Sequence, residues 1–537
     1  MKKKVLDDIP ALFKKKDPGY LFVMNITYLL LLLTFGSCKN EVSVNQVRPN
    51  ILFIMSDDHT SQAWGIYVGI LENHVKNKHI KRLAREGTVL DNAFCTNSIC
   101  TPSRAAILTG KYSHQNGIYT LSESLEPDSF HIAKLLQKHD YQTAIIGKWH
   151  LKKKPAGFDY YNVLPGQGRY QNPILKTASN WEAGGQEYSG FSADVIGDLS
   201  IDWLKSREEG KPFFLMTHFK ATHEPFDYPQ RYRDLYENMQ IPEPPTLLDF
   251  QPSSNSRTFT GQTMDILQGR YEKAAQLKSS GKYSRYPGPP VQTEGLDSIA
   301  GRKETYQKFI KDFMRSGAAI DDNIGKLLAF LDANKLTENT IIIYTADQGY
   351  FLGEHGFFDK RMIYEEALRM PFVIRYPKEI PAGKRNKDII LNIDFPSLIA
   401  DYAQLTPPSS FQGKSFRNNL TGKTAENWRN SMYYRYWLHQ SNRPAHFGIR
   451  TDRYKLAFFY GQPLAKPGAH KETTPPAWEF YDLSGDPYEN SNSYHNPDYT
   501  SIINELKEEL KEWRKKLNDT DKDDPVMQNI LENNWDQ

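Results

Sequence analysis

Ile51-Leu52-Phe53-Ile54-Met55 is an uninterrupted apolar run that ends at Ser56-Asp57-Asp58. A run without polar alternation is typical of a strand buried on both faces, as in a parallel sheet covered by helices. Similar runs recur at residues 143–147, 212–216 and 340–344, and a helical spacing of apolar residues lies between the last two. The alternation predicts an α/β fold with a large, mainly parallel sheet flanked by helices.

Polar side chains follow each of the four apolar runs. Asp57 and Asp58 come directly after the first run. The polar residues after the other runs are, in chain order, Lys148 and His150, His218 and His223, and Asp347 and Gln348. Because the carboxyl ends of parallel strands meet at one edge of a sheet, where ligands bind, we expect these groups to form one composite site.

The acidic members of this group indicate a metal site. Asp57, Asp58, Asp347 and Gln348 offer hard oxygen donors with net negative charge, which suit Ca²⁺ or Mg²⁺ rather than zinc. A lone Asp-Asp pair is more often a helix cap or a turn. This pair ends a buried strand and has a matching pair far downstream. We therefore expect one divalent cation, with Ca²⁺ favoured and Mg²⁺ as the alternative.

The pattern changes near residue 405, where a turn-rich break precedes several short aromatic strand signals and an amphipathic helix. We expect a large α/β domain over residues 49–405 that contains the composite site, and a smaller C-terminal α+β subdomain with an antiparallel sheet over residues 406–537. The proline-rich residues 224–300 are expected to be irregular. A loop of that length is either a lid that shapes the substrate site or surface decoration.

Composition limits the class of protein. The 537 residues are 39% hydrophobic, enough for a large core, and the net charge of +3 gives no global basic field for binding nucleic acid. Only three cysteines occur, so a fold stabilised by several disulfide bonds is not expected. Cys95 is interpreted as a small buried hydrophobic residue.

The first 38 residues have the composition of a targeting segment. Basic residues precede an apolar run, and the small residues Gly36 and Ser37 then precede Cys38. The ending is similar to a bacterial lipoprotein signal, in which Cys38 becomes the lipidated N-terminus, and residues 39–48 form a linker. We expect an exported periplasmic or cell-surface lipoprotein that meets the membrane only through its lipid. A plain secreted protein or an uncleaved anchor is the alternative.

The segment Cys100-Thr101-Pro102-Ser103-Arg104, followed by residues 105–110, carries the most specific motif. It resembles the signature C-x-P-S-R-x-x-x-[LT]-T-G of the type I sulfatases. From the residues alone, the alternative is a core thiol beside the start of a helix. Three further elements are similar to those of the family: Gly147-Lys148-Trp149-His150, His223-Glu224-Pro225 and Asp359-Lys360-Arg361.

The resemblance implies an alkaline phosphatase-like fold and a specific site. A formylglycine-generating enzyme would convert Cys100 to formylglycine (3-oxoalanine), the nucleophile that attacks sulfur. The implied metal ligands are Asp57, Asp58, residue 100, Asp347 and Gln348, and the last of these replaces the usual Asn with a longer side chain. The implied catalytic residues are Cys100, Arg104, Lys148, His150, His223 and Lys360.

Each implied catalytic residue has an expected role. Arg104 braces residue 100 and the metal carboxylates, while Lys148 and Lys360 contact sulfate oxygens and stabilise charge in the transition state. His223 is expected to give a proton to the leaving alcohol. His150 is expected to act later as the base that takes a proton from residue 100.

The resemblance therefore implies a sulfuric ester hydrolase that acts on sulfated oligosaccharides or polysaccharides. The stretches 164–173 and 354–361 look like those of N-acetylglucosamine-6-sulfatases and of sulfatases that act on ulvan. One alternative is a phosphonate monoesterase or phosphodiesterase of the same superfamily. The other is a catalytically silent carbohydrate-binding relative, which would hold if Cys100 is never oxidised.

Overall fold

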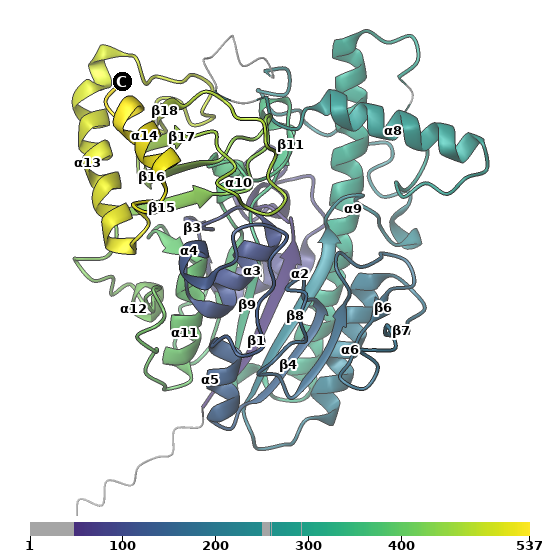
Figure 1. Ribbon diagram of the computed structural model, residues 1–537. Helices are drawn as coiled ribbons and strands as arrows, with labels where there is room; N and C mark the ends of the chain where they lie inside the picture. Colours follow the sequence, from purple (N-terminus) through teal and green to yellow (C-terminus); the bar gives the residue numbers. More distant parts are fainter. Residues whose placement is uncertain (1–47, 250–257, 259, 292) are drawn as a thin grey trace, which may run out of the picture. The chain divides into compact units, whose positions relative to one another are not determined.

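The apolar run at residues 51–55 forms part of β1 (Asn50–Asp57), an interior strand of an eight-stranded sheet (Figure 1). The sheet has the order β13-β2-β12-β9-β1-β8-β4-β5. The other strands are β8 (Phe213–Thr222), β4 (Gln142–Lys148), β5 (Tyr160–Leu164), β9 (Thr340–Ala346), β12 (Phe372–Arg375), β2 (Thr88–Leu90) and β13 (Lys384–Asn386).

The strands around β1 are parallel. β1 pairs in parallel with β8 on one side and with β9 on the other, and β8, β4 and β5 continue in parallel. β12 is antiparallel to both of its neighbours, β9 and β2. The predicted α/β class with a mainly parallel sheet is confirmed.

This computed structural model describes residues 48–249, 258, 260–291 and 293–537, and residues 48–537 cluster as one compact unit. The predicted leader with Cys38 and nearly all of the predicted linker 39–48 lie outside the described residues. Among the described helices, none combines the length and the apolarity needed to span a bilayer.

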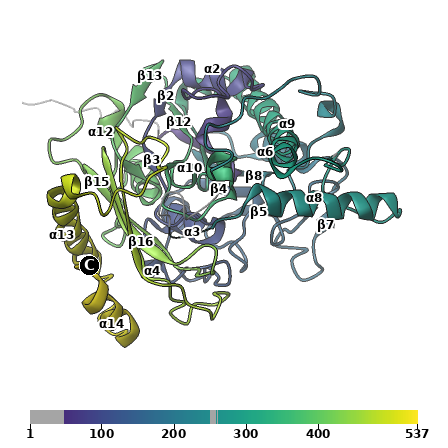
Figure 2. The ribbon, with the colours of Figure 1, turned by 90° about the horizontal axis from the view of Figure 1, so that it is seen from above.

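Helices cover both faces of the sheet, as the unbroken apolar runs predict. Ile51, Phe53 and Met55 of β1 belong to one hydrophobic cluster, and Leu52 and Ile54 belong to another. The first cluster includes residues of α3 (Cys100–Thr109), α5 (Ile132–Lys138) and α11 (Phe395–Tyr402). The second includes residues of α2 (Lys78–Glu86), α6 (Ser192–Ser206) and α9 (Ser298–Ala333), and Figure 2 shows α3 opposite α6 and α9.

The C-terminal region forms a second sheet with the order β15-β16-β17-β18, antiparallel throughout, as predicted. The strands are β15 (Ser431–Tyr436), β16 (His446–Thr451), β17 (Tyr454–Phe459) and β18 (Ala477–Asp482). The amphipathic helix α13 (Thr500–Leu517) packs on this sheet through Ile503, Leu506 and Leu510. α14 (Pro525–Asn534) follows it.

The expectation of an irregular segment over residues 224–300 is wrong in part, because α8 (Met264–Ser279) lies within it. Met264, Leu267, Tyr271 and Ala274 recur at helical spacing and are buried in a cluster with residues of α9. Proline-rich flanks conceal this period in the sequence. α9 then begins after Asp297, whose carboxylate accepts from two backbone N–H groups of its first turn.

Candidate active site

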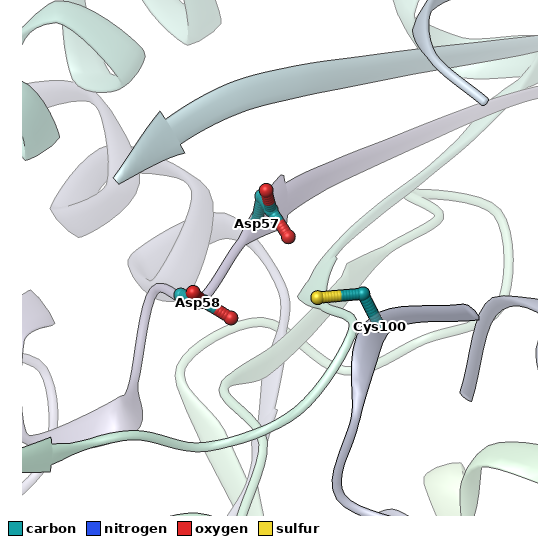
Figure 3. A group of neighbouring side chains, drawn as sticks. All are labelled: Asp57, Asp58 and Cys100. Carbon is teal, nitrogen blue, oxygen red and sulfur yellow. The ribbon is translucent and has the colours of Figure 1, made fainter. Parts of the chain in front are cut away.

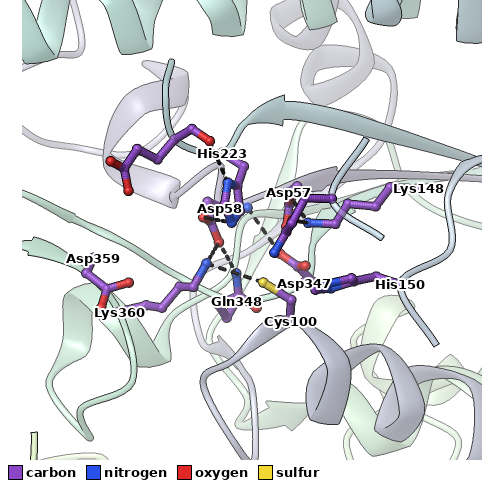
Figure 4. Close-up of polar contacts among 12 residues, drawn as sticks. Asp57, Asp58, Cys100, Lys148, His150, His223, Asp347, Gln348, Asp359 and Lys360 are labelled. Carbon is purple, nitrogen blue, oxygen red and sulfur yellow. Dashed lines mark hydrogen bonds and ion pairs between the residues drawn. The ribbon is translucent and has the colours of Figure 1, made fainter. Parts of the chain in front are cut away.

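The ends of four neighbouring strands, β9, β1, β8 and β4, bring the predicted site residues together (Figure 4). Asp57 is the last residue of β1, Lys148 is the last residue of β4, and Asp347 and Gln348 directly follow β9. His223 directly follows β8, which lies between β1 and β4. The site therefore lies beyond the carboxyl ends of parallel strands, as expected.

Cys100 comes from a different element and faces the carboxylates of Asp57, the last residue of β1, and of Asp58, which follows it (Figure 3). Helix α3 begins at Cys100, directly after the extended residue Ile99. One ligand atom from each of Asp57, Asp58 and Cys100 lies within 4.8 Å of the other two, and all three residues are buried. The N-terminus of α3 adds positive potential at residue 100, which favours an anion there.

The residues present fit an oxygen-liganded divalent cation. Among the described residues, Asp57 Oδ1 and Gln348 Oε1 are buried atoms without a hydrogen-bond partner. Asp347 lies beside them and accepts a hydrogen bond from the backbone N–H of Asp58 at 3.1 Å. A buried acceptor that accepts no hydrogen bond is costly, and two such oxygens beside further carboxylates form an arrangement that a hard cation satisfies.

The electrostatics of Asp58 agree with this interpretation. Burial raises the pKa of Asp58, Lys360 lowers it, and the carboxylates of Asp57 and Asp347 raise it again, to about 7. Three carboxylates this close repel one another in a site with little water. A divalent cation relieves that repulsion.

Two ammonium groups lie among the carboxylates. Lys148 Nζ pairs with Asp57 and donates to Gln167 Oε1 at 2.6 Å. Lys360 Nζ pairs with Asp58 and lies 3.3 Å from Cys100 Sγ. These two lysines are the donors best placed to meet an anion at residue 100.

Arg104 connects the helix to the strand ends. Its Nε donates to Asp347 Oδ2 at 2.9 Å, and its Nη1 donates to the Lys148 carbonyl oxygen at 2.8 Å. Its Nη2 lies 3.6 Å from Asp57 Oδ1. One buried guanidinium thus contacts residues of β1, β4 and the turn after β9.

Two histidines border the site. His223 Nδ1 donates to the Glu224 carbonyl oxygen at 2.8 Å, and its Nε2 lies 3.8 Å from Asp58 Oδ2. His150 Nδ1 lies 3.4 Å from Thr101 Oγ1, and that hydroxyl donates to the His150 carbonyl oxygen at 3.1 Å, so Nδ1 is the donor and Nε2 the acceptor. His218, which lies within β8, instead donates from Nδ1 to the Lys148 carbonyl oxygen at 3.2 Å.

Both bordering histidines are neutral in this environment. Burial, followed by the charge of Lys148, lowers the pKa of His150 to about 2. Burial also holds the pKa of His223 well below its usual range, with Asp57 opposing that effect and Lys148 adding to it. A neutral imidazole has the protonation state of a base.

Some residues of this site were not assigned a role from the sequence. Gln167 lies in a glycine-rich turn and binds Lys148, although nothing in its pattern separates it from a surface glutamine. Glu224 pairs with Arg270 of α8 at 2.9 Å and with Arg285 at 2.5 Å, which ties the 261–290 segment to the residue after His223. Lys220 lies within β8, and a lysine inside a buried strand is a sequence signal for a functional residue.

Two family models match the chain. The model described as Sulfatase matches residues 49–405, and the model described as N-sulphoglucosamine sulphohydrolase, C-terminal, matches residues 353–516. The first includes every residue of the site. The second covers the antiparallel sheet and most of α13.

Individual relatives match over most of their length. The chain is 36% identical to an N-acetylglucosamine-6-O-sulfatase of Bacteroides thetaiotaomicron, over 96% of this chain and 97% of that protein. It is 26% identical to an ulvan-active sulfatase of Formosa agariphila, over 91% and 87%. A solved structure of a protein in complex with its substrate D-glucosamine-2-N,6-O-disulfate has a TM-score of 0.79 and 35% identity, covering 89% of this chain and 100% of that one.

Proposed function

The chain belongs to the sulfatase family, and on that premise we propose that it hydrolyses the 6-O-sulfate ester of glucosamine-type sugars. The broader activity, a sulfatase acting on sulfated carbohydrate, follows from the family and from its relatives. The observation that supports the finer substrate is the 36% identity to an N-acetylglucosamine-6-O-sulfatase over nearly the whole of both chains. The identity to the ulvan-active sulfatase is lower.

Two groups complete the site in this proposal. A divalent cation would be held by the oxygens of Asp57, Asp58, Asp347 and Gln348 together with residue 100, and when bound it polarises a sulfate oxygen. Cys100, matured to formylglycine, supplies a hydrated aldehyde as the nucleophile. Asp57 Oδ1 and Gln348 Oε1 are buried and accept no hydrogen bond from a described residue, which supports the first assignment.

The lysines bind and orient the sulfate. Lys360 lies beside residue 100, and Lys148 pairs with Asp57 next to it, so both ammonium groups can offer donors to the non-bridging sulfate oxygens. They offset the repulsion between the anionic ester and the carboxylates around it, and they stabilise charge that develops on those oxygens. Arg104 holds Asp347 and the Lys148 backbone in place, so the donors need not reorganise.

The two histidines move protons. In the substrate complex, His223 Nε2 carries the proton that goes to the leaving alcohol, because its Nδ1 is already committed to the Glu224 carbonyl. Its pKa is low in the free site, and the negative charge of a bound sulfate ester raises it, so the proton is taken up with the substrate. His150 is neutral and accepts a proton at residue 100 in the second half of the cycle.

The test compares kcat/KM on three substrates: N-acetylglucosamine-6-O-sulfate, a sulfated ulvan oligosaccharide and an aryl phosphate diester. We expect the first to be hydrolysed most efficiently, with the Cys100→Ala variant as the blank for contaminating activity. A large preference for the diester would reject the sulfatase assignment in favour of the phosphoesterase alternative. A preference for the ulvan fragment would replace the proposed sugar.

We also propose that the protein is exported as a lipoprotein through Cys38 and is matured by a formylglycine-generating enzyme. Fractionation of cells that express the full chain and a Cys38→Ala variant tests the first point. The full chain is expected with the membrane, and the variant is expected to be released. Equal distribution of the two would contradict lipidation.

A further inference from the structure

Lys220 is a buried lysine close to the site that the catalytic scheme does not use. It lies in β8, three residues before His223, and its exposed fraction is 3%. Within the described part of the chain, its ammonium group makes no hydrogen bond and no ion pair. The charged groups that act on its pKa are Lys148, Asp57, Asp58 and Cys100, so it faces the same cluster of charges.

The other buried lysines behave differently. Lys148 pairs with Asp57, Lys360 pairs with Asp58, and Lys455 pairs with Glu365 and Glu489. Lys507 donates to the Trp535 carbonyl oxygen. A buried ammonium without a direct hydrogen bond or ion pair is costly to the fold, and its position beside the site makes Lys220 a candidate to bind an anionic ligand.

The surroundings of Lys220 hold its ammonium in place. It lies 4.6 Å from the centroid of the Tyr170 ring, a cation–π contact that replaces part of the lost hydration. Tyr170 is itself fixed, because its ring stacks on Phe191 and its hydroxyl donates to the His223 carbonyl oxygen at 2.5 Å. The aromatic support of Lys220 is thus bonded directly to the backbone of the predicted proton donor.

The backbone of β8 is irregular at this lysine. β1 advances two residues from Met55 to Asp57, while its partner β8 advances four, from His218 to Thr222. The extra residues form a bulge with Lys220 at its centre. Bulges re-aim side chains and are over-represented next to active sites.

From this geometry we propose that Lys220 is a further substrate-binding residue whose ammonium, supported by Tyr170, binds an anionic group of the sulfated substrate. The inference rests on the proposed function, because that function supplies the anion. The anion is either the sulfate that is cleaved or a second acidic substituent on the sugar. Burial together with Lys148 lowers the pKa of Lys220 to about 8, and a bound anion keeps the group charged.

The experiment measures ligand binding in the absence of turnover. Cys100→Ala protein, in the presence of Ca²⁺, is titrated with glucosamine-6-O-sulfate, with glucosamine-2-N,6-O-disulfate and with inorganic sulfate. The same titrations are repeated on Cys100→Ala protein that also carries Lys220→Met or Lys220→Arg. Lys507→Met, which removes a buried ammonium of α13 in the C-terminal subdomain, is the matched control.

We expect Lys220→Met to weaken binding about ten- to hundredfold, the effect of losing one charge-assisted hydrogen bond. Its melting temperature should be unchanged or higher, because an unpaired buried charge is removed, and Lys220→Arg should retain part of the affinity. Lys507→Met should lower the melting temperature and leave all three dissociation constants unchanged. Weaker binding of both sugars indicates the cleaved sulfate, and weaker binding of the disulfate alone indicates a second acidic group.

Unchanged dissociation constants for all three ligands in Lys220→Met would overturn the proposal. A lower melting temperature with weaker binding that Lys220→Arg does not restore would also overturn it, because that result describes a structural lysine. If the parent protein binds neither sugar, the proposed substrate class fails. Inorganic sulfate then decides the role of Lys220 separately: weaker binding in Lys220→Met supports it, and equal binding rejects it.

Discussion

Two clusters of buried charge in this molecule are built differently. The first is the site at the strand ends, around Asp57, Asp58 and Cys100. The second, here called the hub, consists of Glu365, Arg450, Lys455 and Glu489 and joins α10 (Glu365–Leu368) to β16 and β17. In the hub, Lys455 lies 2.6 Å from Glu489 and 3.0 Å from Glu365, and Arg450 lies 3.1 Å from Glu365.

The two clusters differ in whether their polar groups remain available to bind a ligand. The hub has two cations and two carboxylates that meet one another, and it holds the C-terminal sheet to the catalytic part. The site is bordered by His223, whose side chain is 19% exposed, and it contains a nucleophile position and the buried amide oxygen Gln348 Oε1, which accepts no hydrogen bond from a described residue. The hub therefore serves stability and the site serves chemistry, so changes in the two should have separate readouts.

The largest effect is expected from Cys100→Ala. Loss of the nucleophile should lower kcat by about 10⁵-fold or more, on the scale seen when other enzymes lose theirs. The melting temperature should stay nearly constant, since only a small buried side chain changes. Steady-state assays and thermal unfolding of the same preparation check both. Retained turnover would refute the nucleophile assignment.

Removal of the metal is expected to have the second-largest effect on turnover. Chelation is expected to abolish turnover and to lower the melting temperature, because a ligand that binds only the native state stabilises it. Ca²⁺ or Mg²⁺ should restore both readouts. A protein free of divalent metal by elemental analysis that keeps full activity would contradict the metal site.

His223→Ala is expected to separate substrates by their leaving group. A sugar sulfate should lose about 10²- to 10⁴-fold in kcat/KM, the usual contribution of a general acid. A nitrophenyl sulfate should lose much less, because nitrophenolate departs without a proton. Equal losses on the two substrates would assign the acid to another residue.

A change in the hub should have the smallest effect on catalysis. Lys455→Met leaves Glu365 and Glu489 buried without their shared cation, a cost of about 3–5 kcal/mol in the free energy of unfolding. Denaturant unfolding measures that cost, and kcat/KM well below the melting temperature should remain that of the parent. A large loss of kcat/KM in a folded variant would contradict the claim that the hub affects stability and not catalysis.

Much of this arrangement could be predicted from the sequence because two local signals coincide. Apolar runs such as residues 51–55 mark doubly covered strands, and the polar residues directly after them are forced to one edge of the sheet. Asp57, Lys148, His223 and Asp347 were placed together on that basis alone.

Other features depend on tertiary structure and leave little trace in one sequence. The helical period of α8 is masked by flanking prolines, and its partner surface on α9 is not visible locally. The bulge that places Lys220 arises from unequal spacing in two paired strands, and neither strand shows it alone. The role of Gln167 depends on a contact with Lys148 across a turn.

The central claim is that residue 100 acts as an aldehyde hydrate among the metal carboxylates and the two lysines. Mass spectrometry of the peptide that contains residue 100, taken from fully active protein, tests it most directly. We predict a peptide in which the CH₂–SH side chain has become CHO, in an amount that tracks the specific activity. Fully active protein that carries only the unmodified thiol of Cys100 would contradict the claim.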